Sequence, residues 1–311
     1  KSLCVSALIL ASIMLFSALP LSAAATPHGG GAIQQVPFAA MIEDGANRIR
    51  IDNDSDLQNQ AAMHLWPGTG SSSDPFLVQG WTLQGDDSAP AILVGNTSLH
   101  LRFIDILVQD LRENSYPPLM VFNNVTGVDL DRVHAYQEFE NDSLEVQDSR
   151  DVGVLNCTLG NVYVNECDDV TLRNCTVGPC DGLYVMQSRN LTISDCLFDS
   201  TCVFDMYHCN GVMLSNNTLL NITTGVGLIY SDHVTLWSNT FLNCSLCVNP
   251  ESLNGGYDPY RHLVAPDNNT VNGSPLVFLR DIQLLGEVPA GAGQLILYNV
   301  TGATVTDYDL Q

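Results

Sequence analysis

The 311-residue sequence has almost no lysine. Lys1 is the single lysine, and lysine and arginine together number 11, against 34 aspartates and glutamates. The formal net charge of −23 repels nucleic-acid phosphates, so the composition excludes nucleic acid as a partner. This excess of acid is typical of secreted or surface proteins in salty or calcium-containing medium, although it also serves simple solubility. We expect no resident cofactor, and calcium is the one ion that the acidity favours.

Long hydrophobic runs are missing beyond residue 25, where no segment approaches the roughly 18 apolar residues of a membrane span. The mature chain is therefore predicted not to span a membrane. The first 25 residues differ, because an apolar core at residues 7–19 precedes the small residues 22–25. This pattern indicates a signal peptide, with a retained membrane anchor as the alternative. We expect a secreted or cell-surface protein.

Thirteen Asn-x-Ser/Thr sequons fit a glycosylated export product. Composition alone also produces sequons, since turns in a β-rich repeat favour Asn and the following strands favour Thr. Three of the sequons, at Asn156, Asn174 and Asn216, fall at the tight corner of the repeat described next. Their side chains are expected to be partly buried there, which would block glycan addition.

Helical periodicity is absent from the central region, which excludes ankyrin and TPR arrays, and the Leu-x-x-Leu-x-Leu frame of leucine-rich repeats is also missing. Instead one motif recurs, most clearly at residues 152–159, 170–177 and 191–198. Other copies begin at Leu99, Val128, Val212 and Val234, giving spacings of 29, 24, 18, 21, 21 and 22 residues. Self-similarity at this period indicates a solenoid with one coil per repeat.

Each copy alternates apolar and polar residues, which is the periodicity of a β-strand. A second alternating stretch lies about eight residues earlier, and a third short strand follows the Asn-Cys corner. Three short strands per coil of about 21 residues predict an all-β parallel β-helix. The inward positions expected at and after the corner are Ile104, Val133, Cys157, Cys175, Cys196, Asn217 and Asn239, then Ile106, Ala135, Leu159, Val177, Phe198, Leu219 and Phe241.

Residues 86–249 resemble the right-handed parallel β-helix repeats of carbohydrate-binding and sugar-hydrolase proteins and of the NosD-type copper-accessory family. Residues 66–85 are similar to the Gly-x-Gly-Thr/Ser, Asp-Pro-aromatic segment that precedes the first coil in archaeal and bacterial surface β-helix proteins. Residues 268–278 resemble the Asn-Thr-Val-Asn-Gly-x-Pro segment of NosD-type proteins, with Ser274 where the family usually has Lys. Such repeats specify fold strongly and function weakly.

The predicted organisation has five parts. A signal peptide (1–25) precedes a linker and N-terminal cap (26–85), in which residues 54–64 are helical with Ser55 or Asp56 as N-cap. The β-helix follows at 86–249, then a loop and hairpin insertion at 250–285 with a turn at Asn272-Gly273. Residues 286–311 resume the β-helix and stop in mid-coil, so we expect a C-terminal continuation in a longer protein.

Cysteines fall into two groups. Cys157, Cys175 and Cys196 occupy equivalent positions on successive coils and should stack as buried thiols. The disulfide candidates are Cys180 with Cys202, in comparable loops of neighbouring coils, and Cys244 with Cys247, which could close a small loop.

Alternation in the strand before the corner motif places Val146, Val164, Val185, Met206 and Leu228 inward and two columns of polar and aromatic residues outward. In β-helix enzymes and lectins that this chain resembles, the corresponding face lines a glycan groove. We predict that this face binds an extracellular or cell-surface glycan, although an ordinary decorated face is the alternative. The candidate residues are Glu145, Tyr163, Asn165, Tyr184, Met186, Asp205 and Tyr207.

Catalysis has less support from these residues. Lyases similar to this fold rely on Arg or Lys with calcium carboxylates, and the face offers neither base. Glu145 and Asp205 are three coils apart, roughly 14 Å by strand spacing, which is too far for paired carboxylates in hydrolysis. Asp181 or Asp199 on flanking loops could approach Asp205, so a hydrolase stays open as an alternative.

A copper-accessory role would need clustered soft ligands. Met186, Met206, His208 and Cys209 are neighbours in the repeat, but Met206 should point inward. Cys244-x-x-Cys247 has no second Cys pair, so a zinc site there is poorly supported. Lone histidines such as His208 and His233 are interpreted as surface turn residues.

Overall fold

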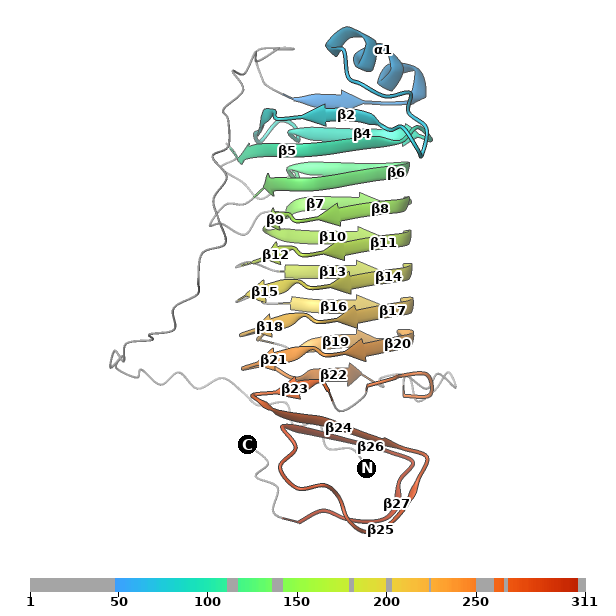
Figure 1. The fold of residues 1–311 in the computed structure, drawn as a ribbon, viewed down its shortest axis with the longest axis vertical. Coiled ribbons are helices and arrows are strands. Elements are labelled where there is room, and N and C mark those ends of the chain that lie inside the picture. Colours follow the sequence, from blue (N-terminus) through green and yellow to red (C-terminus); the bar gives the residue numbers. More distant parts are fainter. Residues whose placement is uncertain are drawn as a thin grey trace, which may run out of the picture. The chain divides into compact units, whose positions relative to one another are not determined.

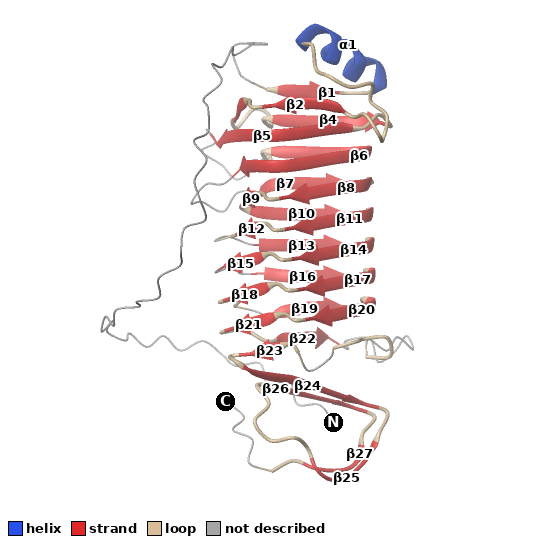
Figure 2. Ribbon diagram, in the orientation of Figure 1, coloured by secondary structure: helices blue, strands red, loops and turns tan. Residues whose placement is uncertain are grey.

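The computed structural model describes residues 48–110, 117–135, 142–178, 182–199, 203–223, 225–249, 260–265 and 268–306. The predicted signal peptide, Cys180, Cys202 and Asp181 lie outside these residues. The described chain is a right-handed parallel β-helix with about 21 residues per coil, which confirms the predicted fold (Figure 1). Strands dominate, and the described part contains a single α-helix (Figure 2). Within that part no helix has the length and apolarity of a membrane span.

Three rows of parallel strands run along the stack. The first row pairs each strand with its counterpart on the next coil. Its strands are β1 (Ile49–Ile51), β4 (Ile92–Thr97), the start of β6 (Met120–Ala135), β7 (Asp142–Gln147), β10 (Asn161–Asn165), β13 (Gly182–Met186), β16 (Val203–Tyr207), β19 (Val226–Ile229) and β22 (Leu246–Asn249).

The second and third rows adjoin each other at the tight corner. The second row consists of β2 (Phe76–Gln79), β5 (Leu101–Asp110), the middle of β6, β8 (Arg150–Leu155), β11 (Asp168–Arg173), β14 (Arg189–Ser194), β17 (Asn210–Ser215) and β20 (Asp232–Trp237). The third row consists of β3 (Thr82–Gly85), the ends of β5 and β6, β9 (Thr158–Leu159), β12 (Thr176–Val177), β15 (Leu197–Asp199), β18 (Thr218–Leu220), β21 (Thr240–Leu242) and β23 (Thr270–Val271).

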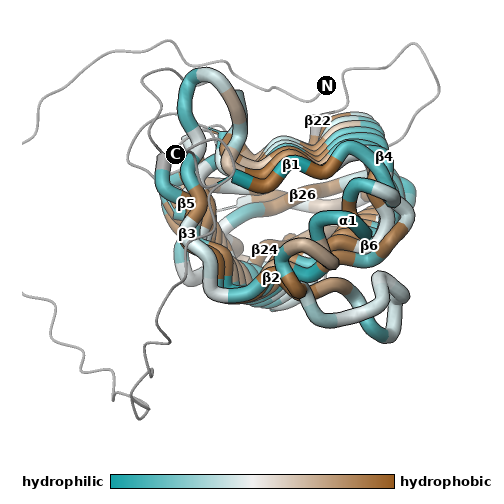
Figure 3. Tube along the Cα trace, turned by 90° about the horizontal axis from the view of Figure 1, so that it is seen from above, coloured by the Kyte–Doolittle hydropathy of each residue, from teal (hydrophilic) through white to brown (hydrophobic). Residues whose placement is uncertain are grey.

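The core fills the interior of the coils, where apolar residues alternate with outward polar ones (Figure 3). In the first row the predicted inward column of Val146, Val164, Val185, Met206 and Leu228 is buried and in register. The corner column from Val133 to Asn239 is buried as well, and Cys175 is only 2% exposed. The stacked thiols of Cys157, Cys175 and Cys196 are therefore confirmed as part of the core.

The backbone at the corner explains why Asn is frequent there. Seven successive corner residues adopt the left-handed conformation with φ between 52° and 56°, which Asn and Asp tolerate better than most residues. These residues are Asp105, Arg132, Asn156, Asn174, Asp195, Asn216 and Ser238. The expectation that Asn156, Asn174 and Asn216 are partly buried is wrong: all three are exposed, because the left-handed residue projects outward and its successor points inward.

The first copy of the motif was placed two residues too early. Ile106, not Ile104, aligns with Val133, and Ile104 pairs with the outward-facing Asp131. The left-handed residue Asp105 interrupts the alternation here, so Ile104, which was expected to point inward, lies outward and is partly exposed, whereas Phe103 and Ile106 are buried. The pairing between β5 and β6 fixes the correct register of this copy.

The N-terminal end combines a helix with a coil. Helix α1 (Asp54–His64) buries Leu57 and Ala61 against the end of the stack, and its N-cap is Asn53 rather than Ser55 or Asp56. The Asn53 side chain accepts a hydrogen bond from the backbone N–H of Asp56 at 3.0 Å. Strands β1, β2 and β3 already pair in parallel with β4 and β5, so the first coil lies within residues 49–85.

The C-terminal end contains the expected hairpin. Asn272 and Gly273 both have positive φ, and the turn joins β23 to β24 (Ser274–Arg280) in antiparallel pairing. Strand β24 then pairs in parallel with β26 (Gln294–Tyr298). A separate two-stranded sheet contains β25 (Gln283–Glu287) and β27 (Thr301–Thr304). Coil-like parallel pairing is therefore already present at β23, within the predicted insertion at 250–285 and before the predicted boundary at 286.

Candidate functional site

The two predicted outward columns are present on the first row of strands. Cα pairing places one column in the order Glu145, Tyr163, Tyr184, Asp205 and Gly227. It places the second in the order Gln147, Asn165, Met186, Tyr207 and Ile229. Apart from Gly227, which has no side chain, these residues are all partly exposed. The structure therefore brings all seven candidate residues onto one face, here called the tyrosine face.

The three tyrosines stack on one another along the face. The Tyr163 and Tyr184 ring centroids are 6.3 Å apart at an interplanar angle of 17°, and those of Tyr184 and Tyr207 are 5.4 Å apart at 26°. Parallel rings that follow each other along the stack cover each other's flat faces. The tyrosines consequently offer hydroxyl groups and ring edges outward rather than open ring faces.

Hydrogen bonds link the two columns at the centre of the face. The Tyr207 hydroxyl is bonded to the Tyr184 hydroxyl and to the Asp205 carboxylate, and these contacts with partial burial raise the pKa of Tyr207. Burial also raises the pKa of Asp205, against the opposing hydrogen bonds from Tyr207 and the backbone N–H of Gly227. A Cβ on Gly227 would lie 2.0 Å from an Asp205 carboxylate oxygen, so any side chain at this position would displace the carboxylate.

Glu145 lies at the opposite end of the candidate column from Asp205. Its carboxylate accepts a hydrogen bond of 2.5 Å from Gln147, whose own amide oxygen accepts one from Asn123 at 3.2 Å. Burial, followed by the charge of Asp142, raises the pKa of Glu145. The carboxylates at the two ends are thus both less hydrated than ordinary surface acids, a property that suits contact with a ligand.

Replacement of Glu145 by Gln should stabilise the protein at neutral pH. The pKa of Glu145 is raised in the folded chain above the value of about 4.3 that an ordinary Glu has in the unfolded chain. Between these two pKa values the folded chain binds more protons than the unfolded chain, so the stability of the wild type falls as pH rises through this interval. Urea denaturation should show a gain for Glu145→Gln at about pH 7 that shrinks at about pH 3, where the carboxyl is protonated in both states. Glu166→Gln is the control, since Glu166 is an exposed turn residue whose equivalent on the next coil is Gln187. A pH-independent gain for Glu145→Gln would contradict the prediction.

The face does not bring Glu145 and Asp205 together as a carboxylate pair. The two residues are separated by β10 and β13, so three strand spacings of about 4.8 Å lie between them. Retaining and inverting glycosidases place their carboxyl groups roughly 5–10 Å apart. The distance argument from the sequence is therefore confirmed by the strand register.

The soft ligands considered for copper do not converge. Met206 is fully buried and Cys209 is 1% exposed, and both lie inside the coil. Met186 lies outward, where its sulfur accepts a hydrogen bond from the Tyr163 hydroxyl at 3.6 Å. The His208 ring stacks on Tyr230 at 4.8 Å.

The candidate small-loop disulfide between Cys244 and Cys247 is not formed, since neither cysteine is part of a disulfide. The Cys244 thiol contacts the Leu219 carbonyl oxygen at 3.3 Å. Cys247 lies in the outward column of the first row, in register with Gly227.

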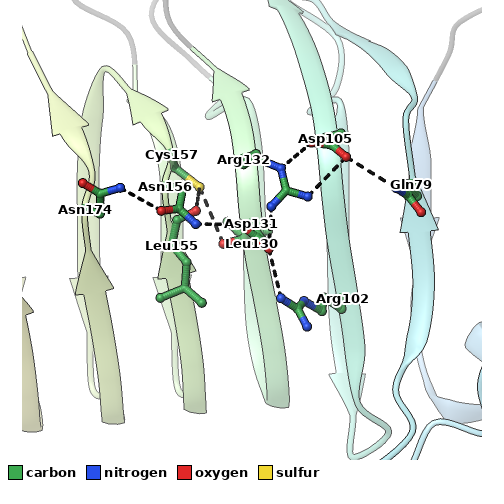
Figure 4. Close-up of polar contacts among 10 residues, drawn as sticks. All are labelled: Gln79, Arg102, Asp105, Leu130, Asp131, Arg132, Leu155, Asn156, Cys157 and Asn174. Carbon is green, nitrogen blue, oxygen red and sulfur yellow. Dashed lines mark hydrogen bonds and ion pairs between the residues drawn. The ribbon is translucent and has the colours of Figure 1, made fainter. Parts of the chain in front are cut away.

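A second polar cluster surrounds Asp131, one of the most buried carboxylates (Figure 4). Arg102 and Arg132 donate to its Oδ2 at 2.9 and 3.1 Å, and Asn156 donates to its Oδ1 at 2.9 Å. Arg132 also bonds Asp105 on the neighbouring coil. These donors occupy both carboxylate oxygens, so the cluster joins adjacent coils and offers no free ligand position.

A third cluster was missed from the sequence. Asp232, His233 and His262 place their possible ligand atoms within 4.8 Å of one another. His233 was interpreted as a lone turn residue because His262 is distant in sequence and follows an irregular segment. An adjacent Asp-His pair was the available signal, and it is too common to suggest a site.

Comparison with known proteins supports the repeat assignment. Residues 118–255 match the family model of NosD, described as periplasmic copper-binding protein. The repeats are similar to NosD. This match confirms the resemblance inferred from the sequence, for that segment of the chain. No curated protein matches the chain.

Two solved structures are distantly similar. ORF18 of Geobacillus virus E2 has 12% identity and a TM-score of 0.49, covering 81% of this chain and 56% of that protein. The A-module of the mannuronan C-5 epimerase AlgE4 from Azotobacter vinelandii has 11% identity and a TM-score of 0.32, covering 86% and 97%. The chain thus spans little more than half the length of the viral protein, and no functional conclusion follows from either likeness.

Proposed function

We propose that the chain is an exported β-helix module that binds an extracellular glycan along the tyrosine face without cleaving it. The observation that supports this most is the continuous set of hydroxyl, carboxyl and amide groups on β7, β10, β13 and β16. Coils repeat at about 4.8 Å, close to the length of one pyranose unit, so a polysaccharide along the stack meets similar groups at each step. Calcium could act as a bridging ion where the glycan is itself acidic.

Recognition on this face depends on hydrogen bonds. The tyrosine rings cover one another, so their hydroxyls and edges are the parts that meet a ligand. Tyr and carboxylate groups bond sugar hydroxyls directly, and Asn165 adds an amide in the second column. Glu145 and Asp205 repel uronates, so neutral or basic glycans should bind better.

The hydroxyl groups provide the sharpest test. Tyr184→Phe/Tyr207→Phe keeps the rings stacked and removes the central hydroxyls, so we expect an affinity loss of about 10-fold or more, as for two lost hydrogen bonds of about 1 kcal/mol each. Binding isotherms over a panel of neutral, basic and uronate polysaccharides measure this. Trp237→Ala is the matched control, because Trp237 is an exposed aromatic on the second row.

Three outcomes distinguish the alternatives. Equal affinity of wild type and the double Phe variant for every bound glycan removes the tyrosine face from the binding site. Steady release of reducing ends by wild type moves the protein to the polysaccharide-active enzymes. An absence of binding across the panel leaves the face as a decorated surface and contradicts the proposal.

A copper-accessory role is a second candidate, favoured by the description of the matched family. Within the described residues it lacks a cluster of soft ligands, because Met206 and Cys209 lie in the core. Titration with Cu⁺ under reducing conditions tests this role, and binding that is lost on replacement of Met186 would support it.

A further inference from the structure

The start of β20 meets the segment 260–265 in a small polar cluster. The Asp232 carboxylate contacts both imidazoles: its Oδ1 lies 2.8 Å from His262 Nδ1, and its Oδ2 lies 3.3 Å from His233 Nδ1. The two imidazole rings are stacked with centroids 4.3 Å apart. Nitrogen and oxygen atoms of three side chains from two separate chain segments therefore lie within 4.8 Å of one another.

The backbone around these donors is well fixed. Asp232 begins β20, and its N–H donates to the Cys209 carbonyl oxygen at 2.8 Å. On the other side, Val264 exchanges backbone hydrogen bonds with Val234 and Leu236, which docks the segment of His262 along β20. The backbone pairing of the two segments thus places His262 beside Asp232.

Arg280 adds a further constraint on the same segment. Its Nη1 donates to the carbonyl oxygens of Tyr260, Arg261 and Leu263 at 3.1, 2.7 and 3.0 Å. The three carbonyl groups belong to residues on either side of His262, so these hydrogen bonds hold its backbone in a tight turn. Leu263 and Ala265 are buried, so the segment is anchored by apolar contacts as well.

We propose that Asp232, His233 and His262 bind one divalent transition-metal ion of the borderline class, such as Zn²⁺. Two imidazoles and a carboxylate are ligands that this class of ion prefers. The donors lie within 4.8 Å of one another, and ligand distances of about 2.0–2.2 Å require them to move closer. The His233 side chain is 57% exposed, so its ring is able to rotate towards the ion.

The charges at the site favour a cation. The Asp232 side chain supplies the negative charge among the three candidate ligands. The chain as a whole has a net charge of −23, which attracts cations. Three protein ligands leave a coordination position open to water or to an external ligand, as in zinc sites that are not purely structural.

Zinc titration of the full chain tests the proposal. After treatment with EDTA, calorimetry with zinc chloride should show one Zn²⁺ per chain. His262→Gln and Asp232→Asn should each weaken binding by more than the roughly 10–100-fold that loss of an outer-shell partner causes. His208→Gln is the control, since His208 stacks on Tyr230 away from the cluster and should bind zinc as wild type does.

A spectroscopic measurement and a thiol control complete the test. Co²⁺ bound to wild type should give a visible absorption band that His262→Gln lacks, while the far-UV circular dichroism of the two proteins stays the same. Wild-type zinc affinity in His262→Gln would overturn the proposal, as would the absence of saturable binding. Binding that disappears in Cys244→Ser/Cys247→Ser instead would assign the zinc to these two cysteines and equally overturn it.

Discussion

Leu172→Ala should lower the free energy of unfolding by about 2–5 kcal/mol, the range for truncation of buried leucines. Leu172 is 2% exposed and lies on β11 between Val154 and Ile193 of the neighbouring coils. Loss of its side chain leaves a cavity between two coils that are fixed by their backbone ladders. The surrounding residues cannot collapse into this space, so we expect the upper half of the range.

Thr171→Ala is the control for this measurement. Thr171 precedes Leu172 on the same strand, faces outward and is paired with Gly153 and Thr192. Its replacement should change the free energy of unfolding by less than about 0.5 kcal/mol, as for most surface positions. Chemical denaturation of both variants compares them, and equal losses would show that the inward register of β11 is off by one residue.

Asn239→Ala should cost about 3 kcal/mol, although a polar side chain is removed from an apolar interior. Asn239 is 1% exposed, and its Nδ2 donates to the Leu214 carbonyl oxygen at 2.8 Å and to Asn269 Oδ1 at 3.0 Å. Its Oδ1 accepts from the backbone N–H of Asn217 at 3.1 Å. The variant leaves at least two buried groups without partners, each costing about 1–3 kcal/mol.

Asn268→Ala separates this effect from the general loss of an asparagine. Asn268 precedes Asn269, which continues the buried ladder, but Asn268 is exposed and its side chain bonds the backbone N–H and the hydroxyl of Ser238. Water replaces these bonds, so the cost should stay below about 1 kcal/mol. Thermal denaturation and urea denaturation should both show the larger loss of stability for Asn239→Ala. Similar stability of both would mean that the buried Asn ladder contributes nothing specific.

Local alternation was sufficient to predict the coil and the composition of its faces. The inward column of Val146 to Leu228 and the seven candidates on the tyrosine face all lie where their period of two placed them. Alternation works here because side chains on a strand must point to opposite sides of it, whatever the partner strand is. The same argument predicted that Asn217 and Asn239 point inward at the corner.

Pairing between coils is a different matter, because it depends on residues that are far apart in sequence. The left-handed residue Asp105 decides that Ile106 rather than Ile104 points inward, and the contact of β5 with β6 fixes this register. The side-chain torsions that stack Tyr163, Tyr184 and Tyr207 are likewise set by neighbours on adjacent coils.

The sequence by itself determined that this protein is a parallel β-helix with one chemically rich face, because strand periodicity and repeat length are local properties. Only the tertiary structure decided which chemistry that face offers, since ring orientation follows from packing between coils. It alone also brought His262 to Asp232, because the docking of residues 260–265 along β20 depends on backbone bonds and on Arg280. No spacing in the sequence encodes that contact, and a lone histidine in an irregular segment gives no sign of its partner.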